Sequence, residues 1–310
     1  MSVDIIIPVR NGDAYIGDCL KSVLNQSAHS RISRIIVIDD GSEDSTVEIV
    51  GKFIGKNRLV EIHSTKPIGL SAARNYGLAL STSENIAFLD SDDLWIPDKI
   101  ESHFNHLTEH AGCLFSFTLA SEFHNDSEIR MSQGSNTIDP TFDSILLQQF
   151  RIFGSGSSVF VNRSLALLKG GFDEGLKYGE DWDFWLKLAQ NQLPCQLNEN
   201  STLIRLHPLS MQRTRRDGDD RFLNSFIHFH EWAKYPNILQ DSRFKDVAFR
   251  IMWADFRKNF GISELFVTDY CNYLFSNYST IMKKIGLPNN RMFNFLILFQ
   301  RIKQALRGLK

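Results

Sequence analysis

The sequence predicts an α/β fold in which helices flank a mainly parallel, Rossmann-like sheet, followed by a C-terminal helical extension. Three observations predict it. Over about the first 120 residues, short β-branched runs alternate with amphipathic runs. The strand-like runs lack polar alternation, as expected when both faces of a parallel sheet are covered. From about residue 219 the pattern becomes almost wholly helical and rich in aromatic side chains.

The expected elements follow in order along the chain. A buried strand at 4–9 is ended by Asn11 and Gly12, and a helix follows over 15–26, where apolar residues recur at helical spacing. A strand at 34–39 leads to a helix at 46–54, with Asp44 or Ser45 as its N-cap. The remaining expected elements are a strand at 59–62, a helix at 71–80, a strand at 86–89, a helix at 180–190 and a strand at 201–206.

The composition is that of an ordinary folded protein. The 310 residues carry 34 basic and 36 acidic side chains, a near balance that argues against a nucleic-acid-binding protein. With 43% hydrophobic and 23% charged residues, the chain is not intrinsically disordered. The length allows one large domain or two smaller ones, and we place the boundary near 218. The expected domains are 1–218, which is catalytic, and 219–310, a helical extension.

The cysteines and the apolar segments bear on the cellular compartment. Four cysteines, at 19, 113, 195 and 271, form no CxxC pair, so neither a disulfide framework nor a zinc ribbon is expected. The N-terminus lacks the basic region of a signal peptide. The apolar stretch at 292–299 is far shorter than the roughly 20 residues of a membrane span. We expect a soluble cytoplasmic protein, with peripheral contact at the inner face of the membrane left open.

Acidic residues gather where two predicted strands end. The run at 90–93 reads Asp-Ser-Asp-Asp, and the run at 39–42 reads Asp-Asp-Gly-Ser. In open parallel sheets, ligands bind beyond the carboxyl ends of the strands, so the two runs are expected at one edge. The carboxylates at 90–93 are oxygen ligands of the kind that bind Mg²⁺ or Mn²⁺. A carboxylate at 39–40 could accept a hydrogen bond from the N–H of a pyrimidine ring. Taken singly, each run is also explained as a solvated turn.

Two further runs have the composition of a binding or catalytic site. The segment 69–75, Gly-Leu-Ser-Ala-Ala-Arg-Asn, places small residues at a helix start, and Arg74 there would contact a phosphate. The alternative interpretation is that Arg74 is a solvent-exposed arginine on the surface of an amphipathic helix. The segment 179–183, Gly-Glu-Asp-Trp-Asp, opens an aromatic-rich helix. Glu180 and Asp181 are candidates for a general base, and the alternative is ordinary acidic chemistry at a helix N-terminus.

These runs, together with others, resemble one family in order and content. The matching pieces are IIIPVRNG at 5–12, CLKSVLNQ at 19–26, IDDGS at 38–42, GLSAARN at 69–75, FLDSDD at 88–93, GGFDE at 170–174 and GEDWDFW at 179–185. They resemble the inverting glycosyltransferases of family 2, which have the GT-A fold. The resemblance covers about residues 3–215.

The resemblance implies a role for each candidate residue. Asp181 matches the catalytic base, with Glu180 beside it. The metal ligands are Asp92, Asp90 and His207, although His207 is also explained as a surface or core histidine. Arg10 stands where the family often has an aromatic residue beneath the base. The expected nucleotide-sugar contacts are Pro8, Val9, Arg10, Asn11, Asp39, Asp40, Arg74, Asp90, Ser91 and Arg213. The alternative interpretation of Arg213 is that it belongs to a run of charged residues exposed to solvent.

The implied activity is a metal-dependent, inverting transfer of a sugar, with Mn²⁺ or Mg²⁺ as cofactor. The donor is a nucleoside-diphosphate sugar, with a UDP-sugar favoured, and the acceptor a saccharide or lipid-linked saccharide used in cell-surface polysaccharide, lipopolysaccharide or glycolipid synthesis. A catalytically silent nucleotide-sugar-binding module of the same fold is the alternative. A sugar nucleotidyltransferase lacks support because no Gly-rich loop follows the first strand.

A dinucleotide-dependent dehydrogenase is also disfavoured, because no GxGxxG follows the first strand. The last 28 residues, 283–310, contain seven basic and no acidic side chains. We expect most of 219–285 to pack on the catalytic domain or on a second subunit, and 289–310 either to pack in the same way or to lie on an anionic membrane.

Overall fold

The computed structural model describes residues 1–124, 128–131, 138–176, 178–190, 192–208, 223–248, 250–251 and 274–286. The chain forms two compact units, Met1–Ser210 and Met211–Lys310. The predicted boundary near 218, Arg213 and the tail beyond 286 lie outside the described residues, so the expectations for them stay predictions.

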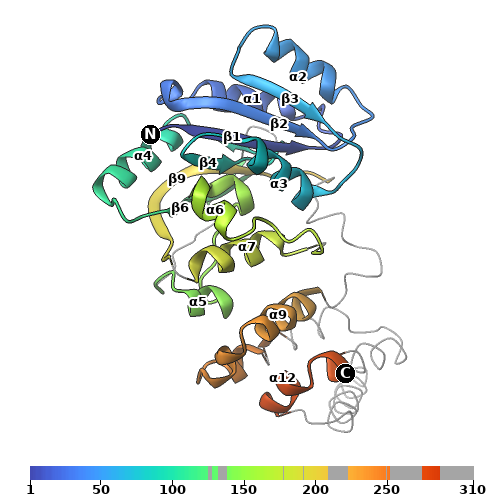
Figure 1. Ribbon diagram of the computed structural model, residues 1–310, viewed down its shortest axis with the longest axis vertical. Coiled ribbons are helices and arrows are strands. Elements are labelled where there is room, and N and C mark those ends of the chain that lie inside the picture. Colours follow the sequence, from blue (N-terminus) through green and yellow to red (C-terminus); the bar gives the residue numbers. More distant parts are fainter. Residues whose placement is uncertain are drawn as a thin grey trace, which may run out of the picture. The chain divides into compact units, whose positions relative to one another are not determined.

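The first unit is built on one mixed sheet. Its described strands pair in the order β3-β2-β1-β4-β8-β6-β9-β5, with β7 beside β6 (Figure 1). The strands are β1 Val3–Val9, β2 Ile32–Asp39, β3 Val60–Ser64, β4 Asn85–Phe88, β5 Leu94–Trp95, β6 Phe115–His124, β7 Glu128–Met131, β8 Val159–Asn162 and β9 Cys195–Arg205. The first four strands are mutually parallel, as predicted. β8 runs antiparallel to β4 and β6, while β9 runs parallel to β6.

Helices cover both faces of the parallel half. Those of the first unit are α1 Ile16–Leu24, η1 His29–Arg31, α2 Thr46–Ile54, α3 Leu70–Leu80, α4 Lys99–Glu109, α5 Phe142–Leu146, η2 Ser155–Ser158, α6 Arg163–Leu168 and α7 Glu180–Ala189. Alternate side chains of β1 and β2 point to opposite faces. Ile5, Ile7 and Val37 pack with α1, α2 and α4, whereas Ile36 and Ile38 pack with α3.

The burial of β1 explains why its residues are apolar at every position except Asp4. All seven of its residues are buried, including Asp4. The Asp4 carboxylate accepts hydrogen bonds from the backbone N–H groups of Thr82 and Ser83, at 2.7 and 3.0 Å, and from the Ser83 hydroxyl. A buried carboxylate is tolerated only when such partners satisfy it. Asp4 therefore ties the start of β1 to the turn before β4.

The cysteines require a correction to the sequence analysis. No disulfide was expected, but Cys113 and Cys195 are joined, with their Cα atoms 6.3 Å apart. Cys113 immediately precedes the β6 region and Cys195 begins β9, and these two strands pair in parallel. The 82 residues between the cysteines in sequence hid this proximity, because it arises only when β9 returns beside β6.

The second unit is described here by itself and in part. Its described helices are α9 Leu223–Lys234, η3 Pro236–Gln240 and α12 Ser279–Lys284. Their core is aromatic, as the sequence pattern predicted: Trp232 packs edge-on against Phe244, and Phe229 stacks on Tyr278. Among the described residues, no helix combines the length and the apolar character that crossing a membrane requires.

Candidate active site

The end of β2 forms a tightly bonded turn. The Asp39 carboxylate accepts the backbone N–H of Ser42 at 3.0 Å, and both oxygens of Asp40 accept backbone N–H groups, from Ile68 at 2.5 Å and Gly69 at 3.0 Å. Both aspartates are buried. Each carboxylate oxygen can accept more than one hydrogen bond, so Asp40 retains capacity for a ligand. Asp40 thereby fixes the loop that leads into α3.

The end of β1 lies against the same turn. The carbonyl of Val9 accepts the backbone N–H of Asp40 at 2.8 Å. Asn11, at φ 52°, donates its backbone N–H to the Ser42 hydroxyl and accepts the N–H of Glu43 through Oδ1, both at 2.8 Å. Asparagine is among the residues that tolerate this left-handed backbone. Pro8 and Val9 are buried, whereas Arg10 is exposed beside them.

A buried arginine links two of the predicted acidic runs. Arg74 is 1% exposed on α3 and donates to Asp90 Oδ1 at 2.6 Å and to Glu180 Oε1 at 3.1 Å. Its guanidinium lies 5.1 Å from the centre of the Phe172 ring. Burial alone would lower the pKa of Arg74, but Asp90 and Glu180 outweigh it and the pKa is raised. Arg74 is therefore a charged bridge between the β4 end and α7, not the surface arginine of the alternative interpretation.

In the acidic run after β4, Asp92 lies beside a histidine from a distant part of the chain. Asp92 Oδ2 lies 2.9 Å from His207 Nε2, so these two side chains, separated by 115 residues, share one site. Burial and the Asp90 carboxylate raise the pKa of Asp92, although His207 opposes the rise. Ser91 is half-buried between Asp90 and Asp92. Carboxylate and imidazole are both ligands for divalent cations, so the Asp92–His207 pair fits the expected metal.

Asp93 has a structural role. It is buried, accepts the Ser157 hydroxyl at 2.6 Å and accepts the backbone N–H of Arg205 at 3.0 Å. Burial, together with the nearby carboxylates of Asp92 and Asp90, raises the pKa of Asp93 well above its ordinary value. The Ser157 hydroxyl also accepts the backbone N–H of Asp90 at 3.0 Å. Asp93 thus anchors the loop 90–93 to η2 and to the end of β9.

The predicted catalytic pair opens α7. Gly179 caps the helix with φ 74°, a left-handed conformation that glycine adopts without strain. Glu180 is 8% exposed and accepts a hydrogen bond from Arg74. Burial and the Asp181 carboxylate raise the pKa of Glu180, although the Arg74 guanidinium opposes the rise. Asp181 is half-buried, and one of its oxygens accepts the N–H of Trp182 at 2.7 Å. A helix N-terminus stabilises the negative charge of both carboxylates.

Three residues of this network escaped the sequence analysis. Ser157 lies between β7 and β8, in a segment that the sequence analysis did not assign to any site. Arg205 donates through Nε to the carbonyl of Asp92 at 2.9 Å and lies over the Tyr15 ring at 4.9 Å. Tyr15 in turn packs against His207, with ring centroids 4.6 Å apart. Of these three residues, only Arg205 could have been found from the sequence, because it lies near the end of the strand predicted at 201–206.

The structure therefore brings together Arg74, Asp90, Asp92, Glu180 and His207, with Asp181 beside Glu180. Asp90 bonds to Arg74, and its role as a metal ligand stays a prediction. The fold and the site together define a class: α/β proteins that bind a ligand beyond the carboxyl ends of parallel strands.

The chain belongs to glycosyltransferase family 2. The model of the family described as "Glycosyl transferase family 2" matches residues 4–166, more than half of the chain. An uncharacterized glycosyltransferase of Rickettsia bellii is 29% identical over 205 residues, which cover 66% of this chain and 29% of that protein. A chondroitin synthase of Pasteurella multocida is 28% identical over 194 residues, covering 61% of this chain and 19% of that protein.

A third relative is the putative teichuronic acid biosynthesis glycosyltransferase TuaG of Bacillus subtilis. It is 38% identical over 117 residues, which cover 37% of this chain and 45% of that protein. In each of these three relatives the match spans less than half of the relative's own length.

The solved structures show the fold. A structure of S. aureus TarS 1-349 with UDP superposes with a TM-score of 0.66 and 17% identity, covering 100% of this chain and 92% of that one. A structure of TarS 1-349 with UDP-GlcNAc gives a TM-score of 0.65 and 17% identity, covering 92% and 82%. The fold of the chain is therefore of the expected GT-A type.

Proposed function

We propose that this chain is a metal-dependent inverting glycosyltransferase, which moves a sugar from a nucleoside-diphosphate sugar to a hydroxyl acceptor. The observation that supports it best is the Arg74 bridge. It joins Asp90, in the run predicted to face the donor, to Glu180, the neighbour of the predicted base. Membership of family 2 supports the same reaction.

The proton acceptor in this proposal is Asp181. Glu180 is held by Arg74, and this bond positions the first turn of α7. Asp181, whose side chain is not held by Arg74, would take the proton from the acceptor hydroxyl as its oxygen attacks the anomeric carbon. General-base assistance of this kind contributes roughly 10²–10⁴-fold to a rate. The bond to the diphosphate breaks on the opposite face, so a single displacement inverts the configuration.

The nucleotide would lie along the ends of β1 and β2. Asp40, which keeps acceptor capacity, would bind the base N–H, with Pro8, Val9 and Asn11 beside it. Asp39 would act through the turn that it holds, and the exposed Arg10 side chain would stack on the base. Arg213 would contact the diphosphate from beyond the described residues.

Asp92 and His207 are the residues that would hold Mn²⁺ or Mg²⁺, with Asp90 next to them. When bound, the cation would supply Lewis-acid stabilisation of the charge on the diphosphate. The supporting contact is the 2.9 Å approach of Asp92 Oδ2 to His207 Nε2. Burial raises the pKa of Asp92, and a nearby cation would favour its ionised form.

The donor is proposed to be a UDP-sugar and the acceptor a saccharide or lipid-linked saccharide in surface polysaccharide synthesis. The support comes from proteins similar to this chain: TarS was solved with UDP-GlcNAc, and relatives are named chondroitin synthase and a teichuronic acid biosynthesis glycosyltransferase. Cytoplasmic location, a peripheral membrane contact and a homo-oligomer remain proposals.

A donor panel tests the proposal. Wild type and Asp181→Asn are incubated with UDP-, GDP- and dTDP-sugars and Mn²⁺, and both thermal shift and release of free nucleoside diphosphate are measured. We expect one donor to raise the unfolding temperature of both proteins. Wild type should release diphosphate, and Asp181→Asn should release it about 10²–10⁴-fold more slowly. Equal release by the two proteins would contradict the base assignment, and stabilisation without release would indicate the silent binding module.

A further inference from the structure

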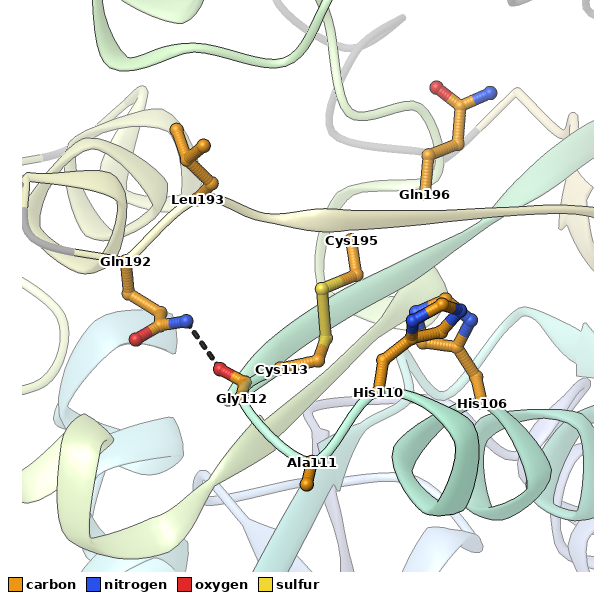
Figure 2. A pocket seen from close by; sticks show the side chains of 9 residues that line it. All are labelled: His106, His110, Ala111, Gly112, Cys113, Gln192, Leu193, Cys195 and Gln196. Atoms are coloured by element: carbon orange, nitrogen blue, oxygen red, sulfur yellow. Dashed lines mark hydrogen bonds between the residues drawn. A yellow bond between two sulfur atoms is a disulfide. The ribbon is translucent and has the colours of Figure 1, made fainter.

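A second cluster of reactive side chains lies at the opposite end of β6 and β9 from the candidate active site. It consists of Cys113, Cys195, His106 and His110. They line a pocket of about 480 Å³ that Figure 2 shows from close by. His106 lies in the last turn of α4 and His110 is the C-cap residue that follows this helix. Cys113 lies just before β6, and Cys195 is the first residue of β9.

The ligand atoms of three of these four residues converge. The sulfurs of Cys113 and Cys195 and a ring nitrogen of His106 all lie within 4.8 Å of one another. Among the described residues, no other group of three histidine, cysteine or acidic side chains converges in this way. His110 follows His106 by four residues, and their ring centroids are 4.4 Å apart. Figure 2 shows the imidazoles of His106 and His110 next to one another, with the disulfide bond drawn in yellow.

Two thiolates and two imidazoles form a donor set typical of structural zinc. Zinc binds cysteine sulfur at about 2.3 Å and histidine nitrogen at about 2.0–2.1 Å in a tetrahedral arrangement. Such a site would hold the sulfurs roughly 3.8 Å apart, which follows from those bond lengths and the tetrahedral angle. The Cα separation of 6.3 Å need not change for this, because rotation of the two cysteine side chains moves their sulfurs apart. The open pocket leaves room for that rotation.

We propose that the reduced form of this cluster binds one zinc ion through Cys113, Cys195, His106 and His110. A dithiol reductant first breaks the Cys113–Cys195 bond, supplies two electrons and two protons to its sulfurs, and closes to its own cyclic disulfide. Binding then releases the two thiol protons to solvent, and the thiolates and neutral imidazoles donate their electron pairs to Zn²⁺. The disulfide form is metal-free.

The proposed zinc site is separate from glycosyl transfer. β9 runs from Cys195 to Arg205, and its 11 residues span roughly 30 Å at the usual rise of a strand. Arg205, at the other end, bonds to Asp92 and Asp93. Gln192 already links the loop before β9 to the carbonyl of Gly112 at 2.6 Å. A zinc ion here would join the end of α4 to the starts of β6 and β9.

Cobalt titration of the full chain tests the proposal. Protein reduced with dithiothreitol and then freed of it under nitrogen is titrated with Co²⁺, followed by Zn²⁺. We expect one equivalent of cobalt to produce an intense thiolate-to-cobalt charge-transfer band in the near ultraviolet, and zinc to abolish it. Asp92→Asn should show the same band, because Co²⁺ held by carboxylate and imidazole gives no thiolate transition. This readout separates the site from the proposed active-site metal.

Matched variants sharpen the result. Cys271→Ser removes a cysteine that is not one of the four proposed ligands and should retain the band at full intensity. Cys113→Ser with Cys195→Ser should abolish it, and His106→Ala and His110→Ala should each weaken cobalt binding about 10–100-fold or more. Circular dichroism checks that each variant is folded. Absence of the band from reduced, folded wild type, or an equal band in the double serine variant, would overturn the proposal.

Discussion

At the scale of single residues, Arg74 is the side chain on which the candidate site depends most. It is buried, while the side chains of its partners, taken without their backbone atoms, are 25% exposed for Asp90 and 11% for Glu180. An arginine can serve two carboxylates at once because its planar guanidinium presents several donors in a fixed arrangement. Removing one partner from a buried ionic network is costly, since the remaining charges lose their compensation.

We therefore expect Arg74→Met to lower the free energy of unfolding by about 3–5 kcal/mol at pH 7. Arg74→Lys should lose less, because the ammonium keeps the charge but cannot span both carboxylates. Urea denaturation monitored by tryptophan fluorescence measures both changes. Equal stability of wild type and Arg74→Met would show that Asp90 and Glu180 need no cation between them.

How far single residues could be predicted from the sequence depends on what brings them together. Asp92 and Asp181 follow recognisable local patterns, and the ends of parallel strands placed Asp40 and Asp92 at one edge. The bond from Arg74 to Glu180 spans 106 residues and depends on the tertiary fold, which no local pattern records. Ser157 and the Cys113–Cys195 pair were missed for the same reason.

At the scale of elements, the contact between α3 and the sheet positions Arg74. Gly77 lies one turn after Arg74, and a Cβ there would stand 2.4 Å from Cγ2 of Ile6 and 3.4 Å from Cγ1 of Ile38. The helix therefore approaches β1 and β2 more closely than any larger residue would permit. Gly51 on α2 offers a contrast, since a Cβ there would meet nothing within 4 Å.

The expected effects of alanine at these two glycines are opposite in sign. Gly77→Ala should destabilise the protein by about 1–3 kcal/mol, because the added methyl forces α3 away from buried Ile6. Gly51→Ala should stabilise it by up to about 1 kcal/mol through helix propensity. Thermal unfolding of the pair measures the difference. A Gly77→Ala protein as stable as Gly51→Ala would contradict the close packing of α3.

Elements with strong local patterns were predicted well. The helix expected at 46–54 is α2 Thr46–Ile54, and the strand expected at 34–39 lies within β2 Ile32–Asp39. The antiparallel half of the sheet was not predicted in detail. Its order follows from long-range pairing of β8 with β4 and β6. The strand expected at 201–206 is part of the longer β9, whose first residues are polar and lack a strand pattern.

At the scale of the whole first unit, a buried lysine couples stability to pH. Lys99 is fully buried, and its Nζ donates to the Thr118 hydroxyl at 2.9 Å, the Thr202 hydroxyl at 3.0 Å and the carbonyl of Ser158 at 3.1 Å. None of these partners is charged. Burial lowers the pKa of Lys99 well below its ordinary value. The unfolded chain therefore binds more protons at this residue than the folded protein does.

The sign of the effect follows from that difference in bound protons. Stability rises with pH between the lowered folded pKa and the unfolded value near 10.4. We expect the wild-type free energy of unfolding to gain up to about 1.4 kcal/mol per pH unit over this window, relative to Lys99→Met. Urea denaturation of both proteins from pH 6 to 9 measures the gain. Parallel stability profiles would show that Lys99 stays protonated when buried.

The most direct test of the proposed active site is UDP binding by calorimetry, with Mn²⁺ or with EDTA, in wild type and Asp92→Asn. If Asp92 and His207 hold the cation that binds the diphosphate, wild type should bind UDP at least about 10-fold more tightly with Mn²⁺. Asp92→Asn should then bind UDP weakly and equally in both conditions. A wild-type dependence on Mn²⁺ that survives in Asp92→Asn would contradict this assignment.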